Sequence, residues 1–497
     1  MRLVRSRGVF PPLRWLAVFF LLAALVLTIF QLVRYSRLRA NLPTGLQIAG
    51  IPVSVLDRQQ AAQRLLEAYT IPVELQYGDA LIQLDPSVVD FQLDLDTMLS
   101  AADIQRTQNT FWEGFWDFLW GRTSTTADVP LRASFSETRL RTHLEQEVAQ
   151  RYDQPPSPAQ PIVGTVNFQP GTPGSSLDID GSVVLIENAL FSNLHRQVAL
   201  PLLRDAPPRP AFQNLEVLIR QTVDLAEFDG LAGIYLMDLQ TNQEMHMAYS
   251  QGETISVQPD IAYTASSIIK IPIMVSVFNR MDDNPDEESL NLLGEMIEKS
   301  GNETADWLMD RVIDPNRAPL FVTEDMQAIG LENTFLAGYF SLGSPLLSLE
   351  QTPANQRIDI TTDPDPYSQT TPSDIGMLLE DIYICAQENG GVLAAVFEGQ
   401  ITQEECQQMI EHLVNNKLPV LLTGGIPEGT RIAHKHGWVS QNGIINTIGD
   451  SGIIYSPGGD YILVVFLYHP VQLVWDPASA LVADISRAVY NYYNLPE

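Results

Sequence analysis

The sequence predicts an α+β protein in which a smaller α+β domain and a larger C-terminal domain follow one transmembrane helix. Three observations lead to this prediction: a long apolar run near the N-terminus, a Pro-rich stretch around residue 207, and strand-like segments at both ends of the C-terminal portion. The 497 residues are enough for two or three domains with separate cores. The expected parts are a cytoplasmic tail with the anchor (1–40), the smaller domain (41–205), a linker (206–212) and the larger domain (213–497).

The transmembrane helix is predicted from residues 15–33, an apolar run interrupted only by Thr28 and Gln31. A helix of about 20 apolar residues spans the roughly 30 Å of bilayer hydrocarbon. A cleaved signal peptide is the alternative, but the run is long for one and no small-x-small cleavage site follows it. Arginines flank both ends and determine the orientation only weakly. Because the chain after residue 40 is acidic and has the pattern of a folded exported protein, we expect an uncleaved single-pass anchor with the remainder outside the cytoplasm.

The net charge excludes some partners. A formal charge of −31 at pH 7 argues against nucleic acid, since phosphate backbones require clustered Lys and Arg. It also makes an anionic membrane surface an unsuitable partner for most of the chain. No sequence pattern indicates a metal or another cofactor, so we expect none.

Cys385 and Cys406 are the only cysteines, and both lie in the exported part. An oxidising compartment would permit one disulfide between them. Two buried apolar thiols are the alternative, and the sequence leaves both open.

The smaller domain alternates strand-like segments with amphipathic helices. Its clearest signal is a hairpin, in which two segments of alternating polarity flank the turn residues Gly78 and Asp79. No group of residues suited to catalysis occurs in it. The expected helices cover 53–67, 138–148 and 181–190, and the expected strands cover 73–77, 80–84 and 163–168.

The larger domain has strands near both ends and is helical between them. A helix at 215–223 opens it, and helices dominate from about 266 to 415. Because the strands from both ends must share one antiparallel sheet, helices are expected on its faces and the helical middle forms an insertion. The expected strands cover 233–239, 244–248, 431–435, 443–448, 452–456 and 461–468, and an amphipathic helix at 478–489 closes the chain.

Lysine is rare in this chain: only four occur, and three of them fall in short motifs. Ser267 and Lys270 are three residues apart at the start of an apolar helix, so both project from one face. A lysine desolvated against apolar surroundings can be neutral and can act as the base that activates a serine hydroxyl. The alternative is a helix-capping serine followed by an exposed lysine.

Two further motifs could complete such a site. Ser300 and Asn302 open a helix and offer a hydroxyl for proton transfer and an amide for a substrate carbonyl, although a capping loop has the same composition. The next motif lies on a predicted strand, where an ammonium can hold an anionic group and a glycine lets a substrate lie alongside. An ordinary edge strand is the alternative. This motif comprises Lys435, His436, Gly437 and Trp438.

In this order, on helix, loop and strand, the three motifs are the signature set of class A β-lactamases and penicillin-binding proteins. Residues 213–497 therefore resemble the class A β-lactamase catalytic domain, and the segment 369–374 resembles its Thr-Thr-Pro segment. The resemblance implies an acyl-enzyme mechanism. It assigns the nucleophile to Ser267, the base to Lys270 and the proton relay to Ser300. Asn302 would bind the substrate amide, and Lys435 would bind the substrate carboxylate. The backbone N–H groups of Ser267 and Trp438 would form the oxyanion hole, with His436 and Gly437 beside the substrate.

The smaller domain carries a second resemblance. From the segment 42–54 through the segment 198–202, its pattern resembles the domain proposed to bind peptidoglycan in VanW-type bacterial cell-wall proteins. The resemblance implies peptidoglycan as a partner of residues 41–205. The alternative is a spacer that lifts the catalytic domain off the membrane and binds nothing.

The chain departs from the β-lactamase pattern in three respects. The family's Glu-x-x-Leu-Asn pattern, whose glutamate activates the deacylating water, is absent. His436 stands where the family has a hydroxyl residue, and the first two motifs are closer together than usual, which favours a wider cleft suited to a peptide or glycan strand. The loop that would carry the glutamate offers Glu350, Asp359, Asp363 and Asp365 at other spacings.

We therefore expect a membrane-anchored, extracytoplasmic serine hydrolase that forms an acyl-enzyme with β-lactams, as in β-lactam breakdown or an antibiotic response. The missing glutamate favours slow turnover. One alternative is a D,D-peptidase or penicillin-binding protein acting on peptidoglycan stem peptides. The other is a non-catalytic protein that binds the cell wall.

Overall fold

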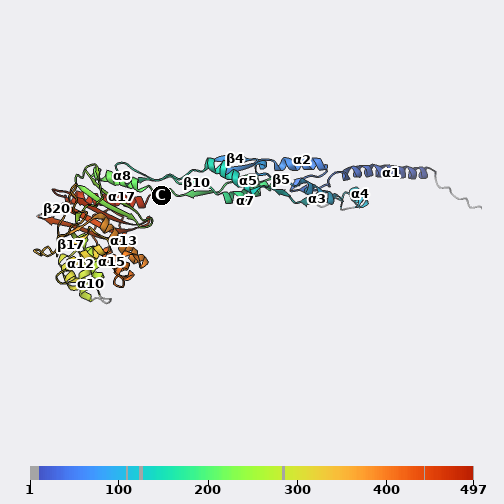
Figure 1. The fold of residues 1–497 in the computed structure, drawn as a ribbon. Coiled ribbons are helices and arrows are strands. Elements are labelled where there is room, and N and C mark those ends of the chain that lie inside the picture. The colour runs from blue at the N-terminus through green and yellow to red at the C-terminus, as the bar shows by residue number, and fades with distance from the viewer. Residues whose placement is uncertain (1–10, 108–109, 123–126, 282–285, 442, 496–497) are drawn as a thin grey trace, which may run out of the picture. The chain divides into compact units, whose positions relative to one another are not determined.

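The computed structural model describes residues 11–107, 110–122, 127–281, 286–441 and 443–495. The chain divides into two units (Figure 1). The first comprises residues 1–156 and 173–206, and the second comprises residues 157–172 and 207–497. Residues 1–10, which hold most of the expected cytoplasmic tail, lie outside the described residues.

The first unit begins with one long apolar helix, α1 (Pro11–Arg39). Its residues Trp15–Arg39 are long and apolar enough to cross a membrane, with a mean hydropathy of 2.8. This is a statement of length and composition, and it agrees with the apolar run in the sequence.

Two small cores stabilise the remainder of the first unit. One lies between a three-stranded sheet of order β11–β3–β4 and helices α5 and α7, and the other joins α2 and α3 to the sheet β2–β1–β6. The β3–β4 hairpin confirms the strongest turn signal in the sequence. The bounds are β1 Gln47–Ile48, β2 Ile51–Pro52, α2 Arg58–Tyr69, β3 Val73–Tyr77, β4 Ala80–Leu84, η1 Pro86–Val89, β5 Gln92–Leu93, α3 Leu95–Thr107, α4 Phe111–Leu119, β6 Asp128–Val129, β7 Ala133–Ser134, α5 Glu137–His143, η2 Leu144–Ala149, α6 Gln150–Tyr152, β10 Gly174–Leu177, α7 Ile179–Leu190, β11 Gln197–Ala199 and β12 Leu202–Asp205.

Helix α2 begins five residues later than predicted because of its cap. Asp57 accepts a hydrogen bond from the Gln60 backbone N–H (2.8 Å), and the Gln60 side chain accepts one from the Asp57 N–H (3.2 Å). This reciprocal capping box satisfies two N–H groups that a helix start leaves unpaired. Residues 53–57 are therefore the approach to the helix, not its first turn.

Residues 157–172 form a hairpin that packs with the second unit, although the sequence predicted them within the domain 41–205. The hairpin pairs β8 (Gln160–Pro161) with β9 (Phe168–Gln169). Its Phe168 ring contacts Tyr492 at a centroid distance of 6.0 Å, and Asn491 donates to the Val166 carbonyl (2.9 Å). The predicted strand 163–168 is wrong, since residues 162–167 form the turn of this hairpin.

The second unit is built on one antiparallel sheet of order β15–β14–β13–β21–β20–β19. Strands from the two ends of the unit meet where β13 pairs with β21, which confirms the sheet predicted from the sequence. Helices α8 and α17 cover one face, and α9, α13 and α15 belong to the core on the other (Figure 1). The bounds are α8 Phe212–Leu225, β13 Leu231–Asp238, β14 Gln243–Ser250, β15 Glu253–Ile255, β19 Arg431–Gln441, β20 Ile444–Ser456, β21 Gly459–Tyr468 and α17 Trp475–Tyr493.

The strands predicted at 443–448 and 452–456 are one continuous strand, β20. The sequence Gly449-Asp450-Ser451-Gly452 reads as a break, but both glycines lie in the ladder. A Cβ on Gly449 would come within 2.6 Å of the Phe466 ring, and one on Gly452 within 2.7 Å of the His434 Cβ. Packing against large neighbours, not a turn, accounts for these glycines.

The helical middle of the second unit matches the predicted insertion. A small sheet of order β16–β18–β17 crosses it, and a disulfide joins Cys385 of α13 to Cys406 of α15. Closing a loop of this length stabilises a fold by about 3 kcal/mol. The bounds are β16 Tyr263–Thr264, η3 Ser266–Ile269, α9 Lys270–Phe278, α10 Glu287–Glu298, α11 Asn302–Leu308, η4 Met309–Ile313, α12 Ala318–Ala328, β17 Phe335–Leu336, β18 Ser368–Thr370, α13 Pro372–Glu388, α14 Gly391–Val396, α15 Gln403–Val414 and α16 Leu422–Gly425.

Candidate active site

Side chains from two separate segments meet around Lys270. This residue opens α9 directly after the turn η3, and it is fully buried. Its Nζ donates hydrogen bonds to Ser267 Oγ (2.9 Å), Asn302 Oδ1 (2.7 Å) and the Ser300 carbonyl oxygen (2.8 Å). Ser300 Oγ lies 3.4 Å from the same atom. The structure therefore brings together the first two motifs that the sequence singled out.

Lys435 brings the third motif to the same place. It is fully buried on β19, the edge strand of the sheet, and its Nζ donates to Ser300 Oγ (2.9 Å). One hydroxyl thus lies between two lysine side chains. We call the group the serine–lysine cluster: Ser267, Lys270, Ser300, Asn302 and Lys435.

Two serines in this region hold unusual backbone angles. Ser266 has a φ of +53° and Ser300 a φ of +59°, in the left-handed region that non-glycine residues seldom adopt. Such residues persist only where the surrounding structure holds them, and they gather at functional sites. Here the strained residues stand immediately before Ser267 and at Ser300 itself.

Gly437 allows the edge strand to approach the turn η3. A Cβ at this position would lie 2.8 Å from the Ser267 backbone nitrogen and 3.0 Å from that of Ile268. Real Cβ atoms do not come this close to backbone, so any side chain would push β19 away from Ser267. The sequence predicted that Gly437 makes room for a substrate. In the structure, Gly437 also lets strand β19 lie against the turn η3.

The surroundings of Lys270 favour its neutral form. Burial and the positive charge of Lys435 lower the pKa of Lys270 from 10.5 to about 7, although the carboxylate of Asp306 opposes the shift. The Phe340 ring centroid lies 5.0 Å from Nζ. Asp306 also accepts hydrogen bonds from the backbone N–H groups of Phe340 and Ser341 (2.9 Å each), so it fixes the loop that carries this ring.

Lys435 is perturbed in the same direction. Burial lowers its pKa to about 8, and the buried carboxylate of Asp450 on β20 partly offsets this. Asp450 in turn accepts hydrogen bonds from His434 Nδ1 (3.0 Å) and the Leu422 backbone N–H (3.2 Å). The Asp450 carboxylate thus lies on β20, the strand paired with the one that carries Lys435, and two hydrogen-bond donors hold it in place.

His436 is held within the protein. Burial and the charge of Lys435 lower its pKa to about 3, so the ring is neutral at physiological pH. Asn416 Nδ2 lies 3.1 Å from His436 Nδ1, which therefore accepts, and the ring stacks on Trp438 at a centroid distance of 5.1 Å. Trp438 in turn meets Trp475 of α17 at 4.6 Å. The sequence predicted a titratable side chain at position 436, but in the structure the His436 ring stays neutral at physiological pH.

Sequence reasoning missed several residues around the cluster. Asp306 follows Asn302 by four residues on a predicted helix, a spacing that places both on one face, so this signal was available. Phe340, Asn416 and Asp450 come near the site only through the tertiary fold, and their neighbours in sequence give no indication of it.

Three of the four carboxylates considered for deacylation make hydrogen bonds or ion pairs elsewhere. Among the described residues, no hydrogen bond joins any of them to the serine–lysine cluster. Asp363 is an exposed residue with a φ of +46°. The others are held locally: Glu350 accepts from Ser348 Oγ (2.6 Å), Asp359 pairs with Arg357 (2.5 Å), and Asp365 accepts from the Tyr367 N–H (2.8 Å).

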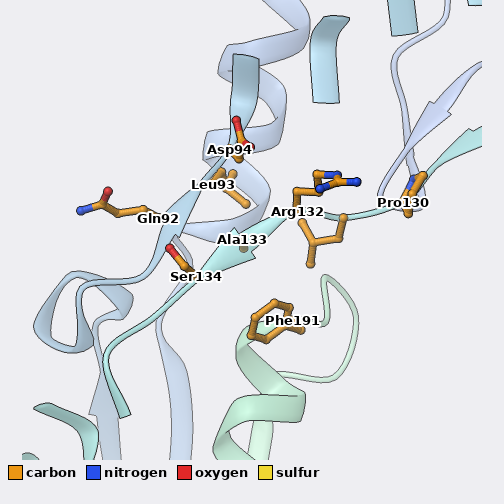
Figure 2. Close-up of a pocket in the computed structure, with 9 residues that line it drawn as sticks. Gln92, Leu93, Asp94, Pro130, Arg132, Ala133, Ser134 and Phe191 are labelled. Atoms are coloured by element: carbon orange, nitrogen blue, oxygen red, sulfur yellow. The ribbon is translucent and has the colours of Figure 1, made fainter. Parts of the chain in front are cut away.

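The first unit contains a separate cavity of about 620 Å³. It lies along strands β5 and β7, and Figure 2 shows Phe191, at the end of α7, together with polar side chains of both strands. No group of three or more His, Cys, Asp or Glu side chains suited to a metal ion occurs in the part of the chain that is described. The cavity is lined by Gln92, Leu93, Asp94, Pro130, Leu131, Arg132, Ala133, Ser134 and Phe191.

Comparisons with known proteins match part of the second unit. A family model described as the β-lactamase enzyme family matches residues 286–493, and no curated protein matches the chain. The C-terminal region is a β-lactamase-like domain with mixed α and β content.

Among solved structures, the chain is similar to PBP-A, with 21% identity over 58% of this chain and 98% of that one and a TM-score of 0.40. It is also similar to a class A β-lactamase from Bacteroides cellulosilyticus, with 18% identity over 57% of this chain and 98% of that one and a TM-score of 0.41.

Proposed function

We propose that this protein is a membrane-anchored, extracytoplasmic serine hydrolase that forms an acyl-enzyme on Ser267 with a β-lactam or a D-Ala-D-Ala-like peptide. One observation carries the proposal. Lys270 Nζ, with a pKa lowered to about 7, lies 2.9 Å from Ser267 Oγ, close enough to accept the hydroxyl proton once the amine is neutral. A base poised near the working pH and within hydrogen-bond reach of a hydroxyl is what activation of a serine requires.

The acylation step follows from this geometry. Neutral Lys270 takes the proton from Ser267 Oγ while the oxygen attacks the substrate carbonyl carbon. The C–N bond then breaks, and the leaving nitrogen receives a proton through Ser300 Oγ, which contacts both lysines. The net result is one new ester bond at Ser267 and one N–H on the leaving group.

The remaining roles concern binding. Lys435, whose pKa of about 8 leaves it largely protonated at pH 7, attracts the substrate carboxylate. Asn302 orients the substrate amide, and the backbone N–H groups of Ser267 and Trp438 stabilise the oxyanion. Loss of a single such donor typically costs about 2.7–4 kcal/mol in the transition state.

Turnover of the acyl-enzyme is proposed to be slow. Hydrolysis needs a base near the ester, and the carboxylates of the candidate loop make their hydrogen bonds elsewhere. This favours a penicillin-binding protein or D,D-peptidase over an efficient β-lactamase. A non-catalytic wall-binding protein remains the alternative, and the perturbed lysine argues against it.

Helix α1 is proposed to anchor the protein, and residues 41–205, most of which belong to the first unit, are proposed to bind peptidoglycan. Helix α1 has the length and composition of a membrane span. The cavity beside β5 and β7 offers Gln92, Asp94, Arg132 and Ser134 with the Phe191 ring, a mixture suited to a glycan or a peptide (Figure 2).

Intact-mass spectrometry of the full chain in detergent after exposure to benzylpenicillin tests the acylation proposal. We expect an adduct of one penicillin mass on the wild type and none on Ser267→Ala. Ser266→Ala is the matched control, because it removes the neighbouring hydroxyl, and it should keep the adduct. An unmodified wild type, or an equal adduct on Ser267→Ala, would overturn the assignment. A long-lived adduct supports the penicillin-binding interpretation, and rapid loss with product release supports a β-lactamase.

A further inference from the structure

Helix α4 carries a stripe of exposed tryptophans. Trp112, Trp116 and Trp120, at its C-terminal cap, are 62%, 56% and 74% exposed. They are four residues apart, so they lie along one face of the helix. Three large exposed aromatic side chains in a row form an apolar patch of the kind that marks an interaction site.

The neighbouring face of α4 packs against the end of α1. The Tyr35 ring lies 5.4 to 5.7 Å from the rings of Phe111, Phe115 and Phe118. A Cβ on Gly114 would come within 2.2 Å of the Tyr35 hydroxyl oxygen, so glycine permits this close approach. The phenylalanines therefore join α4 to α1, and the tryptophans remain uncovered.

The length of α1 indicates the depth in the membrane at which the contact between Tyr35 and α4 lies. The 25 apolar-helix residues from Trp15 to Arg39 extend about 37 Å at 1.5 Å each. A helix of about 20 residues spans the bilayer hydrocarbon, so the part of α1 inside the hydrocarbon would end near residue 34. Tyr35 then follows at the level of the lipid headgroups, together with the basic Arg37 and Arg39 in the last turn. This step rests on the proposal that α1 spans the membrane.

We propose that α4 lies in the headgroup region of the outer leaflet, with Trp112, Trp116 and Trp120 inserted at the boundary between headgroups and acyl chains. Tryptophan concentrates at this boundary, because its ring is apolar while its N–H can bond to headgroups and water. Glu113, which is exposed, and Asp117, which is half-buried, lie on the other side of the stripe. Glu113 also forms the helix cap with Thr110. The helix would thus add a second, interfacial contact to the anchor.

Depth-dependent quenching of tryptophan fluorescence tests the proposal with the full chain in vesicles of three parts phosphatidylcholine to one part phosphatidylglycerol. The lipids carry a nitroxide at acyl position 5 or position 16. The fluorescence of the three stripe tryptophans is obtained as the difference between the wild type and the triple variant Trp112→Phe, Trp116→Phe, Trp120→Phe. We expect the shallow nitroxide to reduce this difference signal at least twofold more than the deep one. Trp307→Phe gives the reference signal of a tryptophan that is 57% exposed in the second unit and belongs to neither α1 nor α4.

Trp15 separates the two proposals. Its signal, obtained from Trp15→Phe, reports insertion of α1 itself. Quenching of Trp15 without quenching of the stripe would overturn the interfacial role of α4 and leave the anchor standing. Absence of both signals would overturn the anchor as well. A stripe that is unquenched in vesicles but whose emission shifts with soluble peptidoglycan fragments, or with protein concentration, would show a glycan surface or a contact between copies, and either result overturns the lipid assignment.

Discussion

Lys435 Nζ and Ser300 Oγ are 2.9 Å apart, and this hydrogen bond joins the edge strand β19 to the loop before α11. The same hydroxyl lies 3.4 Å from Lys270 Nζ. Two buried lysines thus share one neutral partner, and the positive charge of Lys435 disfavours the charged form of Lys270. The electrostatics of this arrangement lead to the first two predictions.

The pH at which the acylation rate rises should shift in opposite directions in the variants Lys435→Met and Asp306→Asn. Acylation requires neutral Lys270, so its rate rises with pH through the pKa of that residue, about 7. Lys435→Met removes a charge that lowers this pKa, so the rising limb should shift to higher pH. Asp306→Asn removes a charge that raises it, so the limb should shift to lower pH. Stopped-flow measurement of the second-order acylation rate constant, with a chromogenic cephalosporin below saturation between pH 5 and 9, follows both shifts in the free enzyme. Shifts in the same direction would contradict the electrostatic account.

Replacement of Lys270 should stabilise the second unit. Burial disfavours the ammonium, so an apolar side chain at this position removes the desolvation cost of the buried charge. The pKa of Lys270 falls from 10.5 in the unfolded chain to about 7 in the fold. The wild type therefore loses stability as the pH falls from 10.5 to 7, and below 7 the contribution is constant.

Calorimetry of the wild type and of Lys270→Met at pH 6, 7, 8 and 9.5 measures this effect. The variant's gain in melting temperature should be largest at pH 6 and 7 and should shrink towards pH 9.5. Arg280→Met is a useful contrast, because Arg280 pairs with Asp325. Its loss should destabilise the unit. A Lys270→Met protein that is less stable than the wild type at pH 7 would contradict the prediction.

The sequence predicted the central sheet, the helical insertion and the members of the serine–lysine cluster. These features rest on local patterns: alternating strands, a helical repeat and short motifs such as Ser267 to Lys270. The surroundings of the cluster could not be predicted in the same way. Asn416 and Asp450 act across strand pairs and loops, so their positions depend on the register of β19 against β20. The continuous strand β20 was missed because glycine marks both turns and tight packing, and the sequence alone does not distinguish them.

Gly437→Ala should slow acylation severely without loss of the fold. The added Cβ would lie 2.8 Å from the Ser267 nitrogen, so β19 must shift away from η3 and the oxyanion donors separate. Strain of this kind costs about 1–3 kcal/mol in stability, and we expect the acylation rate to fall at least 100-fold. Gly294→Ala, in helix α10, is the control, because its nearest contact is 3.7 Å and alanine favours a helix. It should acylate normally and be slightly more stable.

Removal of the loop carboxylates should leave the lifetime of the acyl-enzyme unchanged. A general base contributes about 100- to 10,000-fold to a hydrolytic step, so loss of the true base would lengthen the lifetime greatly. Glu350 and Asp365 instead accept hydrogen bonds from Ser348 and Tyr367. We therefore expect Glu350→Gln and Asp365→Asn to release penicilloate at the wild-type rate, followed by intact mass after removal of free penicillin. A tenfold longer lifetime in either variant would identify that carboxylate as the deacylating base. The slow-turnover proposal would then be replaced by that of a β-lactamase whose base lies at another position in the loop.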